Sequence, residues 1–493
     1  MSDQNKITAT PEDAEEKARR GTRQSLIGRG CVLALGYVVT FILTRKLGPA
    51  DYGVYGVVIS QLYWLEMLAN AGVPGAISKF MVDGNHDQRE IERSAQALLL
   101  GFSLLLFCIS WIVAPQVADL MRIPNGTVLL RIAIIDMPFA ALVFCYDGIL
   151  NGRRRFGVLA GVYAVQGVIR LIGVIALVAL GLSIERALIA TVISTCAISF
   201  WLVLRYHPRG FRPNVRIMKE IAVMTAPQTV YLVTVPLFMN LDLWSLQAWW
   251  KGGSAVVGHY VASMNLAKVL MVIPAAQAGI LFTSVALADA AGDTGRARRH
   301  IQDATRFALI ISAAAWVILS SDASEILGIL YSRPYSEGKY FLPYQIAGFA
   351  LFALFDAFVH ALMAAGRLWR VAGTLVAAVP LVWLSNYILI PRLGPLGAAI
   401  SMVLGLSLGT GIVGVMSYRL FGSLVRPLTL LRIFVAGAVT WVVSSIVEVQ
   451  GVLLLVKFGL LGILYLGVLF LMREITVKDF NLVRKIGSET PIR

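Results

Sequence analysis

The chain has 493 residues, of which 58% are hydrophobic and only 14% are charged, and its mean hydropathy is +0.75. Long apolar runs recur from about residue 26 to residue 472, so the composition excludes a soluble protein and indicates an integral membrane protein. The net charge of +15 is typical of a membrane protein with basic cytoplasmic loops, and no basic stretch is interleaved with aromatic residues, so nucleic acid is not a predicted partner.

Fourteen apolar stretches are each long enough for a helix that crosses a bilayer, which takes about 20 residues. These runs are continuous rather than alternating, so helices are expected and strands are not. The predicted spans begin near residues 26, 53, 95, 128, 157, 187, 221, 258, 302, 341, 371, 397, 428 and 451. The predicted fold class is therefore an all-α integral membrane protein with about 14 transmembrane helices.

The chain is predicted to form two pseudo-symmetric six-helix lobes, residues 25–220 and 221–418. A cytoplasmic tail, residues 1–24, precedes them, and two further helices with a second cytoplasmic tail, residues 419–493, follow. A faint internal repeat indicates the lobes, because five residues recur at an offset of 205: Lys46, Gly48, Ala50, Gly53 and Tyr55 match Lys251, Gly253, Ala255, Gly258 and Tyr260. Parallel repeats of this kind are typical of transporters with a site between the halves.

Lys and Arg concentrate in alternate connections between the spans and in both terminal segments, for example in the run from Arg153 to Arg155. The positive-inside rule therefore predicts an even number of spans with both termini in the cytoplasm. The first 24 residues are polar and charged, which argues against a signal peptide. The cysteines lie singly within apolar runs, and no phosphate-cradling loop or nucleophile motif is recognisable, so no catalytic or metal-binding residues are predicted.

Residues 43–55 (LTRKLGPADYGVY), which close the first span and open the second, resemble the signature of bacterial polysaccharide flippases. Three shorter segments are similar to the same family: 151–156 (NGRRRF), 366–370 (GRLWR) and 393–401 (LGPLGAAIS). With fourteen predicted spans in two halves, the resemblance covers nearly the whole chain. It places the chain in the superfamily that includes the multidrug and toxin extrusion exporters and the lipid II flippase.

The resemblance implies a flippase that moves an undecaprenyl-pyrophosphate-type, lipid-linked oligosaccharide from the cytoplasmic to the periplasmic leaflet of the bacterial inner membrane. Such a protein serves the synthesis of O-antigen or exopolysaccharide by alternating access through a cationic central cavity, with membrane lipids around it. A polysaccharide polymerase and a chain-length regulator are the implied protein partners. No cofactor is expected besides an ion gradient, H⁺ or Na⁺, and no enzymatic activity. A multidrug or cation antiporter on the same fold and a membrane-embedded polymerase remain the alternatives.

Polar side chains on two predicted spans share one helical face. Tyr163, Gln166 and Arg170 are spaced i, i+3 and i+7 in the fifth span, and Glu66 and Asn70 lie on one face of the second. An ionised group at the bilayer centre costs at least ~2.5–3.5 kcal/mol, so these faces are expected to line a hydrated cavity. The predicted substrate-binding residues are Arg170, Lys268, Arg29, Gln166, Tyr163, Glu66 and Asn70.

The three basic residues in this set fit a pyrophosphate, because guanidinium and ammonium groups supply fixed positive charge and hydrogen-bond donors. Each also has a structural alternative. Arg170 and Lys268 could pair with buried carboxylates, for Arg170 with Glu66 or Asp136, and Arg29 could extend its side chain to the lipid headgroups.

Four further groups within the predicted spans are candidates for coupling to an ion gradient: Asp242, Asp356, His360 and Asp136. A buried carboxylate can load a proton or a sodium ion on one side of the membrane and release it once it is solvated on the other. Asp242 is the preferred candidate, since it shares a face of the seventh span with Gln228 and Tyr231. The histidine titrates in a useful range, although a lone histidine in a helix is more often a hydrogen-bonding group.

Overall fold

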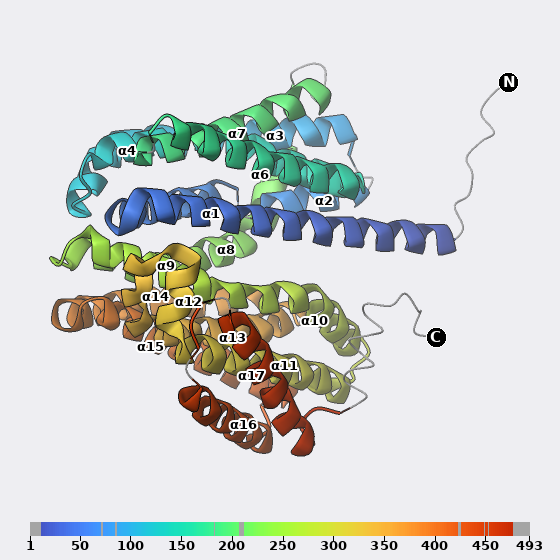
Figure 1. The fold of residues 1–493 in the computed structure, drawn as a ribbon. Coiled ribbons are helices and arrows are strands. Elements are labelled where there is room, and N and C mark those ends of the chain that lie inside the picture. The colour runs from blue at the N-terminus through green and yellow to red at the C-terminus, as the bar shows by residue number, and fades with distance from the viewer. Residues whose placement is uncertain are drawn as a thin grey trace. The chain divides into compact units, whose positions relative to one another are not determined.

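The computed structural model describes residues 11–476, except 71, 84–85, 182, 207–211, 423–424, 448 and 452, and it leaves out the side chains of 11–29, 31–33 and 178–179. Throughout these described residues the regular structure is helical, and no strand occurs among them (Figure 1). The chain divides into two compact units. The first comprises Met1–Asn240 with Gly253–Gly258, and the second comprises Leu241–Gly252 with His259–Arg493. The lobe boundaries at 220 and 418 stay predictions.

Among its described residues, the first unit contains seven whole helices and most of an eighth. They are α1 (Pro11–Asn70), α2 (Val73–Asp83), α3 (Gln88–Leu120), α4 (Gly126–Ile134), α5 (Asp136–Gly152), α6 (Phe156–Ala179), α7 (Ile184–Tyr206) and, for most of its length, α8 (Val215–Trp249).

The second unit holds the remaining helices and two 3₁₀ segments, η1 and η2. They are α9 (Ser254–Ala267), most of which belongs here, η1 (Lys268–Met271), α10 (Val272–Ala290), α11 (Thr294–Ser321), α12 (Ala323–Tyr331), η2 (Arg333–Tyr340), α13 (Leu342–Ala364), α14 (Leu368–Leu393), α15 (Pro395–Phe421), α16 (Pro427–Ile446) and α17 (Leu453–Leu471).

Twelve helical segments among the described residues, from Gln88–Leu120 to Leu453–Leu471, are long and apolar enough to cross a membrane. They match the third to the fourteenth predicted spans one for one. The first two predicted spans lie in α1, which is divided at Gly48, where φ is 72° and ψ is 172° and Pro49 follows. A positive φ at glycine and a proline together end one helix and begin the next. The prediction of an all-α membrane protein is confirmed, and the predicted count of about 14 agrees with these segments.

Two of the twelve segments change helix geometry in the middle. Gly126–Gly152 consists of α4 and α5, which meet at Ile135, and Ser254–Ala290 consists of α9, η1 and α10. Proline explains both positions, because it has no N–H to offer the carbonyl four residues earlier. Pro138 leaves the carbonyl of Ile134 without that bond, and Pro274 does the same for Leu270 inside η1. The breaks place Asp136 and Lys268 at irregular turns within membrane-spanning helices.

In the first unit, α1 packs along α6, α2 packs on α5, and α5 also contacts α3 and α7. The side chains at the centre of this unit are large and apolar and include Ile77, Ile91, Tyr146 and Leu202. Many apolar side chains on the outside stay exposed, among them Phe200 at 64%. Such a surface suits contact with lipid tails, as expected for a membrane protein.

In the second unit, α13 lies at the centre and packs against α10, α11 and α15. The last two helices, α16 and α17, pack on each other and on α11. Their small shared core contains Ile310, Ile433, Ala436 and Tyr465, and the Tyr465 hydroxyl donates to the Ile310 carbonyl at 3.2 Å.

Candidate functional site

A cavity of about 230 Å³ opens within the first unit, between residues of α1, α5, α6 and α7. Five of the residues predicted from the sequence line it, four of them as substrate contacts and one as an ion-coupling group: Arg170, Gln166, Tyr163, Glu66 and Asp136. Apolar side chains such as Leu62 and Phe144 complete the wall, with Thr191 and Thr195 on the side of α7. Four separate helices thus bring charged and polar groups together in one cavity.

Arg170 is the cation of this cavity. Its Nη2 donates to the hydroxyl of Tyr55 at 2.9 Å, and the charges of Glu66 and Asp136 act on it. The Nε of Arg170 is buried and has no hydrogen-bond partner among the described residues. A buried N–H group without an acceptor costs folding free energy. The Nε–H of Arg170 is therefore able to donate a hydrogen bond to a bound ligand.

The two carboxyl groups of the cavity, Glu66 and Asp136, are close enough for their charges to act on each other. Oδ1 of Asp136 is buried and has no hydrogen-bond partner among the described residues. Asp136 also contacts Thr195, whose hydroxyl accepts from Gln166 Nε2 at 3.2 Å. A chain of polar contacts therefore runs across α1, α5, α7 and α6.

Two other predicted residues lie beside this chain of contacts. The Tyr163 hydroxyl donates to Asp147 Oδ1 at 3.0 Å, at the edge of the cavity. Asn70 is only 1% exposed, does not line the cavity, and donates its Nδ2 to the Glu66 carbonyl at 2.8 Å. This hydrogen bond lies in the last turn of α1, and the predicted role of Asn70 in substrate binding stays a prediction.

A second polar cluster lies in the second unit and contains Asp242 and Lys268. Asp242 on α8 is buried and accepts a hydrogen bond from the Tyr260 hydroxyl, and the Lys268 charge acts on it. The Tyr260 carbonyl accepts in turn from Gln345 Nε2 at 3.2 Å. Oδ1 of Asp242 and Oε1 of Gln345 have no hydrogen-bond partner within the described part of the chain.

Asp356 and His360 belong to neither cluster. Asp356 and His360 pair with each other one turn apart on α13, where His360 Nδ1 lies 3.1 Å from Asp356 Oδ2 and 2.9 Å from the Asp356 carbonyl. Arg29 belongs to α1, but its side chain lies outside the described residues. Within the described residues no three His, Cys, Asp or Glu side chains are grouped so that they could hold a metal ion.

Sequence reasoning missed two tyrosines, Tyr55 and Tyr260, as members of these clusters. They are the last matched pair of the internal repeat, and each hydrogen-bonds to a charged residue predicted for the site: Arg170 in the first unit and Asp242 in the second. Their recurrence in the internal repeat, as residues with a hydrogen-bonding side chain, was the sequence signal that could have identified them. Thr195 was also missed, although Thr191 and Thr195 form a polar stripe at helical spacing on α7.

A family model described as "Polysaccharide biosynthesis protein" matches residues 20–287. The succinoglycan biosynthesis transport protein ExoT of Rhizobium meliloti (strain 1021) is 26% identical over 129 residues, 26% of this chain and 25% of that protein. Stage V sporulation protein B of Bacillus subtilis (strain 168) is 23% identical over 423 residues, 78% of this chain and 80% of that protein. The chain thus matches only about a quarter of the length of the first relative.

Solved structures with the same fold include two kinds of membrane transporter. The lipid II flippase MurJ in an inward closed conformation superposes with a TM-score of 0.74 at 16% identity, covering 91% of this chain and 99% of that one. An inward-facing multidrug resistance MATE family transporter of the MOP superfamily has a TM-score of 0.65 at 15% identity, covering 81% and 98%. At these identities the likeness establishes the fold.

Proposed function

This chain belongs to the polysaccharide biosynthesis protein family, and on that premise we propose that it is a flippase for an undecaprenyl-pyrophosphate-type, lipid-linked oligosaccharide. It moves this substrate from the cytoplasmic to the periplasmic leaflet of the bacterial inner membrane, and it carries out no covalent chemistry. Both termini face the cytoplasm. The fold shared with a lipid II flippase supports the proposal.

The observation that carries the proposal is the half-buried side chain of Arg170, which lines the cavity of the first unit with its Nε buried. Its Nε has no acceptor among the described residues, and Tyr55 holds its Nη2 in place. A pyrophosphate offers several anionic oxygens, and charge-assisted hydrogen bonds to it are stronger than neutral ones. Arg170 therefore suits the headgroup of the substrate, with Gln166 and Tyr163 beside it to meet sugar hydroxyls.

The acidic groups supply the coupling to an ion gradient in this proposal. The Glu66 and Asp136 pair can take up and release a proton, and Asp242 with its unpartnered Oδ1 can bind a proton or Na⁺. Substitution of Asp242 by Asn should uncouple transport from the gradient. Transport that remains fully ion-driven in Asp242→Asn would remove this residue from the coupling mechanism.

The experiment that tests the function is deletion of the gene in its host, with complementation by wild type, Arg170→Ala and a matched control, Arg89→Ala. Arg89 is exposed on α3 and lies outside the cavity. Surface polysaccharide is scored together with the sidedness of the lipid-linked oligosaccharide in inverted membrane vesicles. We expect intermediates to accumulate on the cytoplasmic leaflet of the deletion strain and of Arg170→Ala, and rescue by wild type and Arg89→Ala.

Two other outcomes would point elsewhere. Normal polysaccharide in the deletion strain, together with increased sensitivity to cationic drugs, would favour a multidrug antiporter. The acidic pair in the cavity and the MATE-like fold are also compatible with that function. Short chains assembled on the outer leaflet would instead indicate a polymerase. A polymerase and a chain-length regulator are the proposed partners of the flippase, and affinity purification from the complemented strain would detect them.

A further inference from the structure

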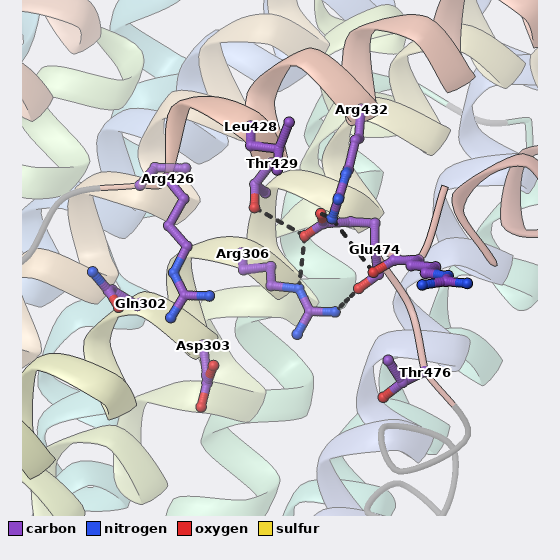
Figure 2. A pocket seen from close by; sticks show the side chains of 11 residues that line it. Gln302, Asp303, Arg306, Arg426, Leu428, Thr429, Arg432, Glu474 and Thr476 are labelled. Atoms are coloured by element: carbon purple, nitrogen blue, oxygen red, sulfur yellow. Dashed lines mark hydrogen bonds and ion pairs between the residues drawn. The ribbon is translucent and has the colours of Figure 1, made fainter. Parts of the chain in front are cut away.

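A basic pocket of about 260 Å³ lies in the second unit, where α11 and the start of α16 meet the segment after α17 (Figure 2). Four arginines line it, and two carboxylates, Asp303 and Glu474, oppose them. The arginines are Arg306, Arg426, Arg432 and Arg473. The pocket therefore carries an excess of positive charge, and none of its residues belongs to the cavity around Arg170.

Glu474 builds one wall of this pocket and is only 5% exposed. Its Oε1 accepts from Arg306 Nε and from Thr429 Oγ1, both at 2.9 Å, and its Oε2 accepts from Arg432 Nη1 at 2.9 Å. Arg306 also donates to the Glu474 carbonyl (Figure 2). These contacts join α11, α16 and the chain after α17, and they fix two guanidinium groups against a single carboxylate.

The other two arginines, Arg426 and Arg473, do not bind Glu474 through their side chains. The guanidinium groups of Arg426 and Arg473 are exposed and make no hydrogen bond or ion pair with any part of the chain that the structure describes. Their backbone positions are well defined: Arg426 is the extended residue before Pro427, the first residue of α16, and Arg473 has a φ of 56° and ends the turn after α17. Two charged donors thus line the pocket without a hydrogen bond or ion pair of their own among the described residues.

The start of α16 adds to this positive field. No side chain caps this helix end, and a helix N-terminus carries partial positive charge. Pro427 has no N–H, and the Thr429 N–H donates to the Arg426 carbonyl. The Leu428 N–H is therefore the donor of the first turn that makes no hydrogen bond among the described residues. In Figure 2 the Arg426 side chain reaches from the start of α16 toward Gln302 and Asp303 on α11. Fork-shaped guanidinium groups beside a helix N-terminus are suited to the oxygens of a phosphate.

The surroundings of the pocket distinguish a lipid phosphate from a free one. Leu428 and Leu431 at the start of α16 are 56% and 57% exposed, and Leu471 at the end of α17 is 82% exposed. Both helices are apolar and long enough to span a membrane. A phosphate held in the pocket can therefore carry acyl chains that lie along these two helices. The distribution of Lys and Arg predicts the cytoplasmic side for this end, where anionic lipids attract basic groups.

The geometry points to a binding site for an anionic phospholipid, with Arg426 and Arg473 contacting the phosphate and the acyl chains lying along α16 and α17. Glu474 keeps Arg306 and Arg432 in position as the back wall of the site. This lipid is a bound component of the second unit, distinct from the transported substrate, and its presence stabilises the packing of α16 and α17 on α11.

The test uses the purified full-length protein in detergent and measures lipid binding by native mass spectrometry, together with thermal unfolding. Phosphatidylglycerol is the probe, and phosphatidylcholine, inorganic phosphate and undecaprenyl pyrophosphate are the comparison ligands. The variant is Arg426→Gln/Arg473→Gln, which leaves all contacts of Glu474 in place. The matched control is Arg298→Gln/Arg299→Gln, which removes the same charge from exposed positions of α11 outside the pocket.

We expect phosphatidylglycerol to bind and to raise the unfolding temperature of the wild type and of the control variant, and to bind the double pocket variant roughly ten-fold more weakly. An equal loss of phosphatidylglycerol affinity in the control variant would show that the total positive charge, and not this pocket, determines binding. That result would overturn the proposed site. Equal binding of phosphatidylcholine, or the same stabilisation by inorganic phosphate, would also contradict it. Displacement of phosphatidylglycerol by undecaprenyl pyrophosphate at much lower concentration would make the pocket part of the substrate path instead. All these readouts are independent of transport activity.

Discussion

Gly53 and Gly258, which correspond in the internal repeat, pack backbone against backbone. A Cβ atom on Gly53 would lie 2.6 Å from the Gly258 amide nitrogen, and one on Gly258 would overlap the Pro49 carbonyl oxygen. The segment of α1 after Gly48 and the start of α9 therefore approach each other as closely as two helices can. Only residues without a side chain allow this approach.

Substitution of either glycine tests this contact. We expect Gly258→Ala to lower the free energy of unfolding by about 1–3 kcal/mol, because backbone atoms on both helices must move apart. Thermal unfolding in detergent and the yield of monodisperse protein measure the effect. Gly279→Ala is the control, since a Cβ there meets nothing within 4 Å and alanine favours the helix. Equal stability of the two variants would show that the crossing tolerates a methyl group.

The hydrogen bond between Tyr55 and Arg170 predicts a loss of transport without the hydroxyl. Tyr55→Phe leaves Nη2 of Arg170 without its acceptor at 2.9 Å, so the guanidinium is no longer held toward the cavity. We expect transport of lipid-linked oligosaccharide in inverted vesicles to fall roughly ten-fold, and to fall further in Arg170→Ala. Tyr418→Phe, at an exposed position of α15, should behave as wild type. Unchanged transport in Tyr55→Phe would show that Arg170 does not depend on this contact.

The ion pair between Lys457 and Asp322 predicts unequal effects of single and double substitutions. Lys457 Nζ lies 2.8 Å from Asp322 Oδ2 and 3.1 Å from the Ser444 carbonyl, and both charged side chains are largely buried. Lys457→Met leaves a buried carboxylate without its partner and should cost about 3–5 kcal/mol of unfolding free energy. The double variant Lys457→Met/Asp322→Asn should recover most of this loss. If the losses of the two single variants simply add up in the double variant, Lys457 and Asp322 have no interaction energy, and the prediction is wrong.

Glu474 predicts a pH dependence outside the membrane-spanning helices. Burial alone would raise the pKa of this carboxyl, but the hydrogen bonds from Arg432 and Thr429 and the charge of Arg306 hold its pKa below the ordinary value. A lowered pKa in the folded state means that Glu474 stabilises the fold above the pKa of the unfolded chain, about 4.3 for glutamate, and that this stabilisation is lost as the pH falls through the folded pKa. The unfolding temperature of Glu474→Gln should therefore lie below that of wild type at pH 7, and the gap should narrow as the medium becomes more acidic. A gap that is constant across this range would contradict the assignment.

The membrane helices were predictable because a bilayer demands continuous apolar runs of one length, so hydropathy alone locates each span. The contacts of the site were less accessible. Helical spacing puts Tyr163, Gln166 and Arg170 on one face, and all three line the cavity. The partner of Arg170, however, lies 115 residues away in a segment that reads as a turn motif. Spacing within one helix carries no information on which other helix faces it.

The basic pocket shows a second limit of the sequence. Arg306, Arg426, Arg432 and Arg473 were visible as cytoplasmic charge, which the positive-inside rule explains without any site. Their convergence depends on the packing of α16 and α17 on α11 and on the left-handed turn at Arg473. That turn could not be foreseen, because arginine has no preference for a positive φ.

The pairing of Lys457 with Asp322 has a consequence for biogenesis. Asp322 precedes Lys457 by 135 residues, so it has already been synthesised when α17, the last membrane helix described, leaves the ribosome. Lys457 therefore enters the membrane when its counter-ion, Asp322, is already there. Pairing removes the free-energy penalty that each of the two charges would have alone in an apolar environment. A chain that ends before α17 would leave that carboxylate unneutralised, and membrane quality-control proteases would have a polar defect by which to recognise the unfinished protein.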